Sequence, residues 1–178
     1  MNINNTVHSL FEDGLIGIGL NPTSAQSKMS SATNLIDLLH DGFYIVFLLK
    51  QQYIPSNVDE FRDKILNLLN HFENQARKLQ FSANDIHDAK YAYCALLDET
   101  IVTQQSAQFF DLQNNWMISP LQLSLFGSQL AGYRFFEILE FLRSQGKDRL
   151  AALEVFHYCM LLGFYGKFRI ESIENLNH

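Results

Sequence analysis

The chain has 178 residues, of which 47% are hydrophobic and 13% aromatic, so it is long enough for one core and too apolar for a disordered chain. Its formal net charge of -6 argues against binding to nucleic acid, because phosphate binding requires clustered lysine and arginine. Fifteen phenylalanines against three prolines and nine glycines favour long regular elements.

The first 32 residues are rich in Asn, Ser and Thr and contain one apolar run, Leu15 to Leu20. We expect residues 1–32 to form a mobile tail or a partly docked arm. No basic region precedes a long apolar stretch here, so we do not predict a secretory signal. The longest uninterrupted apolar stretch, Phe43 to Leu49, is far shorter than the roughly 20 residues that a membrane helix needs.

From residue 33 onward, apolar residues recur at spacings of three and four, which predicts helices. Cap and stop signals then divide the chain into helices at about residues 33–52, 57–79, 82–104, 120–127, 129–145 and 148–162. Residues 105–118 look irregular, and no segment shows the alternation of a strand. We therefore predict an all-α domain over residues 33–170, with six to seven helices in one bundle or in two packed sub-bundles.

The two cysteines, Cys94 and Cys159, each follow an aromatic residue on a predicted helix. This setting is typical of small buried side chains in a reducing compartment, so we predict that they form no disulfide. Neither cysteine has a helix-terminal or cationic setting that would lower its pKa, and we do not expect either to be a nucleophile.

Two adjacent acids, Asp98 and Glu99, lie within the apolar stretch Ala89 to Ile101. On a helical wheel they fall on opposite flanks of the apolar face, and Asp98 shares its side with His87, Tyr91 and Cys94. We expect an exposed acidic strip that docks a basic patch on a partner. The alternatives are a merely solvated pair, or an acid that joins two helices by pairing with Arg134 or Arg143.

Trp116 is either a binding anchor or a core filler, and the sequence favours neither. The candidate partner-binding residues are therefore Asp98, Glu99, Tyr91, His87 and Trp116.

The sharpest enzymatic pattern is Glu154-x-x-His157, which is the spacing used by carboxylate-bridged di-iron bundles, and Asp37-x-x-His40 is a weaker echo of it. Such a site also needs a glutamate from each of two further helices, and no glutamate here is clearly inward-facing. His157 lies on an apolar stripe, which favours a histidine at the edge of the core. We therefore expect no metal, no cofactor and no catalytic residue.

Four ordered segments resemble one known family: AKYAYCALLDETI from Ala89, WMISPLQLSLFG from Trp116, AGYRFFEIL from Ala131 and LEVFHYCMLLGFYGKFR from Leu153. In order and spacing they are similar to the DotU/TssL (IcmH-like) family of inner-membrane proteins in bacterial type VI and type IVB secretion systems. The resemblance spans roughly residues 34 to 169, and four ordered blocks are far more specific than any single one.

The resemblance implies a non-enzymatic scaffold at the bacterial inner membrane, with this domain facing the cytoplasm. Residues 171–178 would begin a linker to a C-terminal membrane helix that lies outside the given chain. The implied partners are a large inner-membrane protein of the TssM/IcmF type, a baseplate component of the TssK type and a second copy of the chain. Two alternatives from other classes are a carboxylate-bridged metalloenzyme and a soluble helical adaptor without a membrane link.

Overall fold

The computed structural model describes residues 34–127 and 131–168. The predicted tail, residues 1–32, and the predicted linker, residues 171–178, lie outside these ranges. Every regular element in the described ranges is helical, which confirms the all-α prediction. None of the described helices is both long enough and apolar enough to cross a membrane.

In chain order the described elements are α3 (Leu35–Leu38), α4 (His40–Lys50), α5 (Val58–Lys78), α6 (Ala83–Val102), the 3-10 helix η1 (Ala107–Phe109), α7 (Phe110–Ile118), α8 (Leu121–Phe126), α9 (Ala131–Gln145), the 3-10 helix η2 (Gly146–Arg149) and α10 (Leu150–Leu161). Only Leu39 separates α3 from α4, so the two together match the first predicted helix.

The predicted caps account for several helix boundaries. The side chain of Asn57 accepts hydrogen bonds from the backbone N–H of Asp59 at 2.9 Å and of Glu60 at 3.1 Å, and α5 begins there. Ser82 accepts from the backbone N–H of Asp85 at 3.0 Å and starts α6. Gly127 has a φ of 64°, a left-handed conformation that ends α8.

The prediction that residues 105–118 are irregular is wrong, because α7 occupies most of that segment. Phe109, Leu112 and Trp116 are buried at spacings of three and four and form its inner face. The helix was missed because no side chain caps its first turn and because Asn114 and Asn115, poor helix formers, interrupt its sequence.

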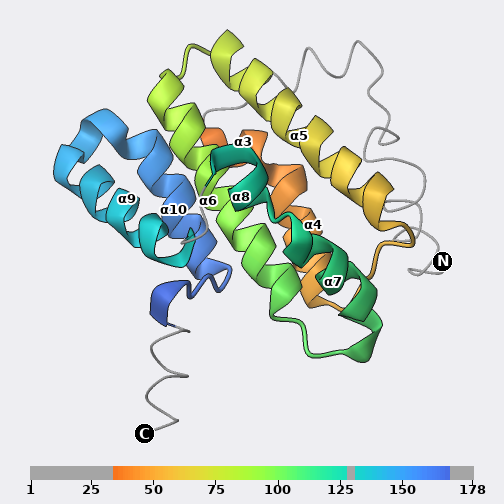
Figure 1. The fold of residues 1–178 in the computed structure, drawn as a ribbon. Helices are drawn as coiled ribbons and strands as arrows, with labels where there is room; N and C mark the ends of the chain where they lie inside the picture. The colour runs from red at the N-terminus through yellow and green to blue at the C-terminus, as the bar shows by residue number, and fades with distance from the viewer. Residues whose placement is uncertain (1–33, 128–130, 169–178) are drawn as a thin grey trace, which may run out of the picture.

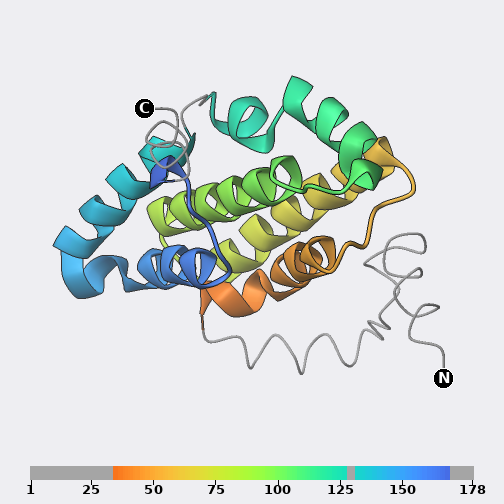
Figure 2. The same cartoon turned by 90° about the horizontal axis from the view of Figure 1, so that it is seen from below.

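The bundle is built around α6 (Figure 1). Helix α6 makes its contacts with α4, α5, α7, α8, α9 and α10. In the view of Figure 2, α7 and α8 lie on one side of α6, while α4 and α10 lie on the other. The buried apolar side chains form one continuous core cluster, so the described helices make one bundle and not two sub-bundles.

Its central position leaves α6 without a broad solvent face. All residues from Tyr91 to Asp98 are buried, although two helical turns of an ordinary surface helix would expose several of them. The apolar composition of this stretch therefore reflects burial on all sides, and any polar group within it needs partners inside the protein.

Candidate functional site

The first candidate residue, Asp98, is buried, with only 7% of its surface exposed. Its Oδ1 accepts hydrogen bonds from the indole Nε1 of Trp116 at 2.7 Å and from the backbone N–H of Leu121 at 3.0 Å. Its Oδ2 accepts from the backbone N–H of Gln122 at 2.9 Å. The carboxylate therefore binds the N-terminal end of α8, and the expectation that Asp98 is exposed is wrong.

The environment of Asp98 acts on its pKa in two directions. Burial raises the pKa of this carboxyl above its usual range, because the charged form loses its water. The hydrogen bonds from Gln122, Trp116 and Leu121 and the charge of Arg62 favour the ionised form and oppose that shift. The three donors thus partly compensate for the cost of burying this acid.

The second acid, Glu99, reaches a different segment. Its side chain, which is partly exposed, accepts hydrogen bonds from the backbone N–H of Tyr165 at 2.9 Å and of Gly166 at 2.7 Å. These two donors lie in the turn that follows α10. Glu99 therefore joins the middle of the bundle to the end of the last described helix.

The acidic pair thus joins elements of the domain, which is the kind of role that the ion-pair alternative predicted. The bonds seen here lead to backbone N–H groups and an indole, whereas the alternative named arginines. Arg143, one of the two expected partners, pairs with Glu140 on its own helix at 2.7 Å.

The segment of α7 and α8 is held at further points to α6, to the residues just after α6 and to α5. The Nε2 of Gln122 donates to the carbonyl oxygen of Tyr91 at 2.7 Å, and the Nε2 of Gln113 donates to that of Gln104 at 2.7 Å. The Nη1 of Arg62 donates to the carbonyl oxygen of Ser119 at 2.7 Å, and its guanidinium carbon lies 4.3 Å from the centroid of the Trp116 ring. Sequence reasoning missed these three polar side chains, because nothing local distinguishes them from ordinary surface residues.

The other three candidates are divided by their exposure. Tyr91 is buried, so the expectation that it is exposed is wrong; Trp116 is also buried, which favours the core reading of the two that the sequence left open. The side chain of His87 is 59% exposed and its ring meets the edge of Phe126, with 5.4 Å between centroids. Of the five candidates, His87 is the one whose side chain is mainly exposed.

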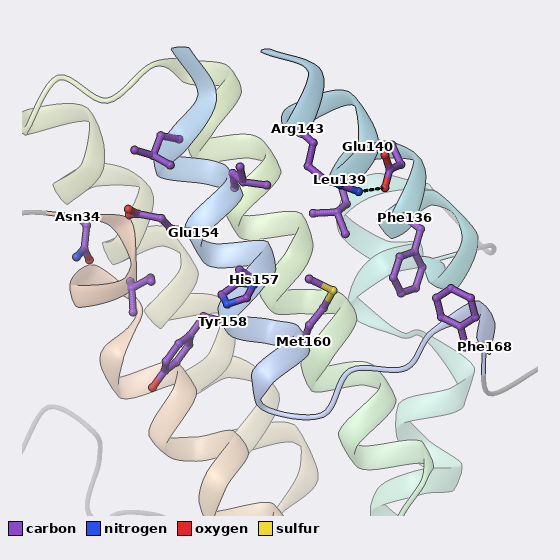
Figure 3. Close-up of a pocket in the computed structure, with 13 residues that line it drawn as sticks. Asn34, Phe136, Leu139, Glu140, Arg143, Glu154, His157, Tyr158, Met160 and Phe168 are labelled. Carbon is purple, nitrogen blue, oxygen red and sulfur yellow. Dashed lines mark hydrogen bonds and ion pairs between the residues drawn. The ribbon is translucent and has the colours of Figure 1, made fainter. Parts of the chain in front are cut away.

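Among the described residues, no further ligands join Glu154 and His157 of α10 to form a metal site. Glu154 and His157 line the same groove, but in the described part of the chain no group of three or more His, Cys, Asp or Glu residues is placed to hold a metal ion (Figure 3). A carboxylate-bridged di-iron site needs six such ligands.

Both cysteines are free and buried, which confirms the prediction that they are unbridged. Burial raises the pKa of the Cys94 thiol and of the Cys159 thiol, and the negative charge of Asp98 adds to the effect at Cys94. Both side chains are therefore protonated at neutral pH and poor nucleophiles.

Two outer surfaces have the character of binding sites. The first, the α3–α4 stripe, consists of Asp37, Asp41, Tyr44 and Phe47, which follow one another at helical spacing and are all exposed. The rings of Tyr44 and Phe47 stack with their centroids 6.2 Å apart. A pair of stacked, exposed aromatic rings beside two carboxylates offers a surface that suits a partner with both apolar and basic side chains.

The second surface is a groove of about 860 Å³ that crosses α10, with α3 on one side and α9 on the other (Figure 3). Leu139, Leu153 and Met160 supply apolar lining, and Asn34 and Phe168 lie at opposite ends. We call this feature the α10 groove. Its volume lies in the range of about 300 to 1,000 Å³ that is usual for ligand pockets.

Comparison with known proteins now decides the family. The family model of DotU, described as type VI secretion system protein DotU, matches residues 34–178. The chain belongs to the DotU family.

Two solved structures resemble this DotU-family domain. The cytoplasmic domain of TssL from Acinetobacter baumannii is 76% identical over 83% of this chain and 92% of that chain, with a TM-score of 0.77. The SciP/TssL of enteroaggregative Escherichia coli 042 is 24% identical over 74% of each chain, with a TM-score of 0.64, and shares the fold. No curated protein matches the chain. The DotU match confirms the resemblance found in the sequence, and it assigns the chain to type VI secretion.

Proposed function

We propose that this DotU-family chain is a non-enzymatic docking component that links the inner-membrane complex of a type VI secretion system to its cytoplasmic baseplate. Family membership and 76% identity to the cytoplasmic domain of a TssL support this proposal. The domain faces the cytoplasm and is anchored in the inner membrane through a helix that follows residue 178. A large membrane protein of the TssM type and a second copy of the chain complete the membrane complex.

The observation that carries the docking role is the α3–α4 stripe. Tyr44 is 38% exposed and Phe47 is 50% exposed, and both belong to a helix whose opposite face is packed in the core. Because that helix is fixed, the two rings are held in place before a partner arrives, which lowers the entropic cost of binding.

The chemistry of the stripe indicates the partner. Asp37 and Asp41 give it a negative end, and the aromatic faces accept a lysine or arginine by cation–π contact. The chain as a whole carries a formal net charge of -6. A basic patch on a baseplate component of the TssK type, containing an apolar residue to cover the rings, has the matching properties.

The proposed docking surface is the α3–α4 stripe, and Asp98 and Glu99 are not part of it. Asp98, Tyr91 and Trp116 are buried, and the backbone bonds of the two acids hold the domain together. We therefore assign them a supporting role, while His87 stays exposed on another face of the bundle and is not required for the stripe.

A binding experiment with two matched double variants tests the stripe. We expect Tyr44→Ser with Phe47→Ser to weaken binding to the purified baseplate component by about 30-fold, because truncating two partly exposed aromatic anchors at about 1 kcal/mol each costs about 2 kcal/mol together. Binding is measured by isothermal titration calorimetry. The control is Phe110→Ser with Met117→Ser, which removes two apolar side chains of 63% exposure each from α7.

Circular dichroism melting shows whether each variant is folded. Normal binding by the folded stripe variant would contradict the proposal, and so would an equal loss in the α7 control. Asp41→Lys should reduce the association rate more than it changes the dissociation rate, since a charge at the rim mainly steers encounter.

A further inference from the structure

The α10 groove is an apolar surface for which the described residues supply no cover. Leu150 is 47% exposed and Phe168 is 51% exposed, while Leu153 and Met160 between them are partly buried. All four side chains line the groove, three from α10 and Phe168 from the segment after it, and Figure 3 labels Met160 and Phe168 there. An apolar surface of this kind usually marks a contact site.

The position of Asn34 links the groove to the N-terminal segment. Asn34 lines the groove and is also the first described residue, so the preceding residues join the fold at this edge. We propose that the apolar run Leu15 to Leu20 of the same chain docks in the α10 groove. The run reads LIGIGL and has four large aliphatic side chains and no charge.

The length of chain between the run and the groove allows this contact. Thirteen residues, 21–33, separate Leu20 from Asn34. Fully extended, they span up to about 40 Å, whereas the twelve residues of α10 are about 18 Å long. The tether is therefore more than long enough for the run to reach the side chains of α10 that line the groove. A covalent tether of this length supplies an effective concentration in the millimolar range, so even a weak contact is populated.

The composition of the groove favours the N-terminal run over the C-terminal segment. Residues 169–178 follow Phe168 in the chain, but they carry Glu171 and Glu174 between their apolar positions. Glu140 and Glu154 line the groove together with Arg143, which pairs with Glu140, so the lining has one more carboxylate than it has guanidinium groups and disfavours two further carboxylates. The run from Leu15 to Leu20 carries no such charge.

Paramagnetic broadening in the intact chain tests the inference. A nitroxide is attached to Asn21→Cys, next to the run; Cys94 and Cys159 are buried and protonated, so they react slowly. We expect the methyl signals of Leu139 and Leu153 in the groove to lose most of their intensity. The methyl signals of Leu112, which is buried on α7, should be unchanged.

Matched variants identify the segment that is responsible. Serine at positions 15, 16, 18 and 20 should abolish the broadening. Val7→Ser, Leu10→Ser and Phe11→Ser together, which change three other apolar residues of the N-terminal segment, should preserve it. Leu150→Glu on the groove side should also reduce it; Leu150 is 47% exposed, and circular dichroism checks that the variant is folded.

Three outcomes would overturn the inference. The first is broadening that persists with the four serines in the run. The second is broadening seen only when spin-labelled chains are mixed with separate, isotope-labelled chains, which would show a second copy in the groove. The third is broadening from a label at Asn175 but not from one at Asn21, which would assign the groove to the C-terminal segment.

Discussion

At residue scale, two neighbouring acids serve two different segments because of helix geometry. Adjacent residues on an α-helix point about 100° apart, so Asp98 and Glu99 cannot reach the same neighbour. Asp98 faces the start of α8 and Glu99 faces the turn after α10. On a helix that is surrounded by other helices, both directions lead to protein, and each carboxylate accepts backbone donors that would otherwise lack partners.

Asp98 is buried and Glu99 is partly exposed, so we expect amide substitution to affect the two positions differently. Both carboxylate oxygens of Asp98 accept hydrogen bonds from N–H groups, and in Asp98→Asn an NH₂ group, which cannot accept, replaces one of them. At least one buried N–H donor then loses its partner, and we expect a loss of about 1–3 kcal/mol in unfolding free energy. Glu99→Gln makes the same chemical change at a partly exposed site, where water can substitute, and we expect a loss of about 0.5–1.5 kcal/mol. Urea unfolding followed by circular dichroism measures both.

If Asp98→Asn proves no more destabilising than Glu99→Gln, the assignment of Asp98 as the more important anchor is wrong. If both variants keep wild-type stability, neither carboxylate anchors the segment to which it is bound.

At the scale of elements, the crossing of α4 over α6 depends on a close approach. The hydroxyl of Tyr93 on α6 donates to the carbonyl oxygen of Gly42 on α4 at 3.2 Å. A Cβ added to Gly42 would lie 2.8 Å from the Tyr93 ring, and that ring is fully buried. The glycine is therefore required by packing, since the middle of a helix otherwise disfavours it.

We expect Gly42→Ala to lower the unfolding free energy by about 1–2 kcal/mol, because the cost of overpacking exceeds the helix propensity that alanine gains. Tyr93→Phe removes both the hydrogen bond and the nearby hydroxyl, so it should cost less in the alanine background than in the wild type. A double-mutant cycle in urea measures this coupling. Strict additivity of the two changes would show that the ring does not press on position 42.

At the scale of the whole molecule, the single core predicts one cooperative transition. Trp116 is the sole tryptophan and is fully buried against Phe61 of α5, with ring centroids 5.7 Å apart, so its fluorescence reports the centre of the bundle. We expect the urea midpoints from tryptophan fluorescence and from far-ultraviolet circular dichroism to coincide. Separate midpoints would indicate the two sub-bundles that the sequence left open.

The sequence was a good guide to the helices and a poor guide to the site, for one physical reason. Apolar residues that recur at spacings of three and four predict helices, and this pattern placed α4, α5, α6, α9 and α10 to within a few residues. A wheel also assumes that residues off the apolar face meet water. Helix α6 is covered on nearly all sides, so that assumption failed for Asp98 and Tyr91. Their partners, Trp116 and Gln122, are more than 15 positions away, at separations that local patterns do not encode.

The attachment of Glu99 to the turn after α10 has a mechanical consequence. A pull on the chain beyond Phe168 passes through Lys167 to Gly166 and Tyr165, whose backbone N–H groups are bound to Glu99. Among the described residues, these are the first backbone bonds to another helix that the load would meet. The two bonds run side by side and share the tension, so force enters the central helix directly instead of peeling α10 from its C-terminal end.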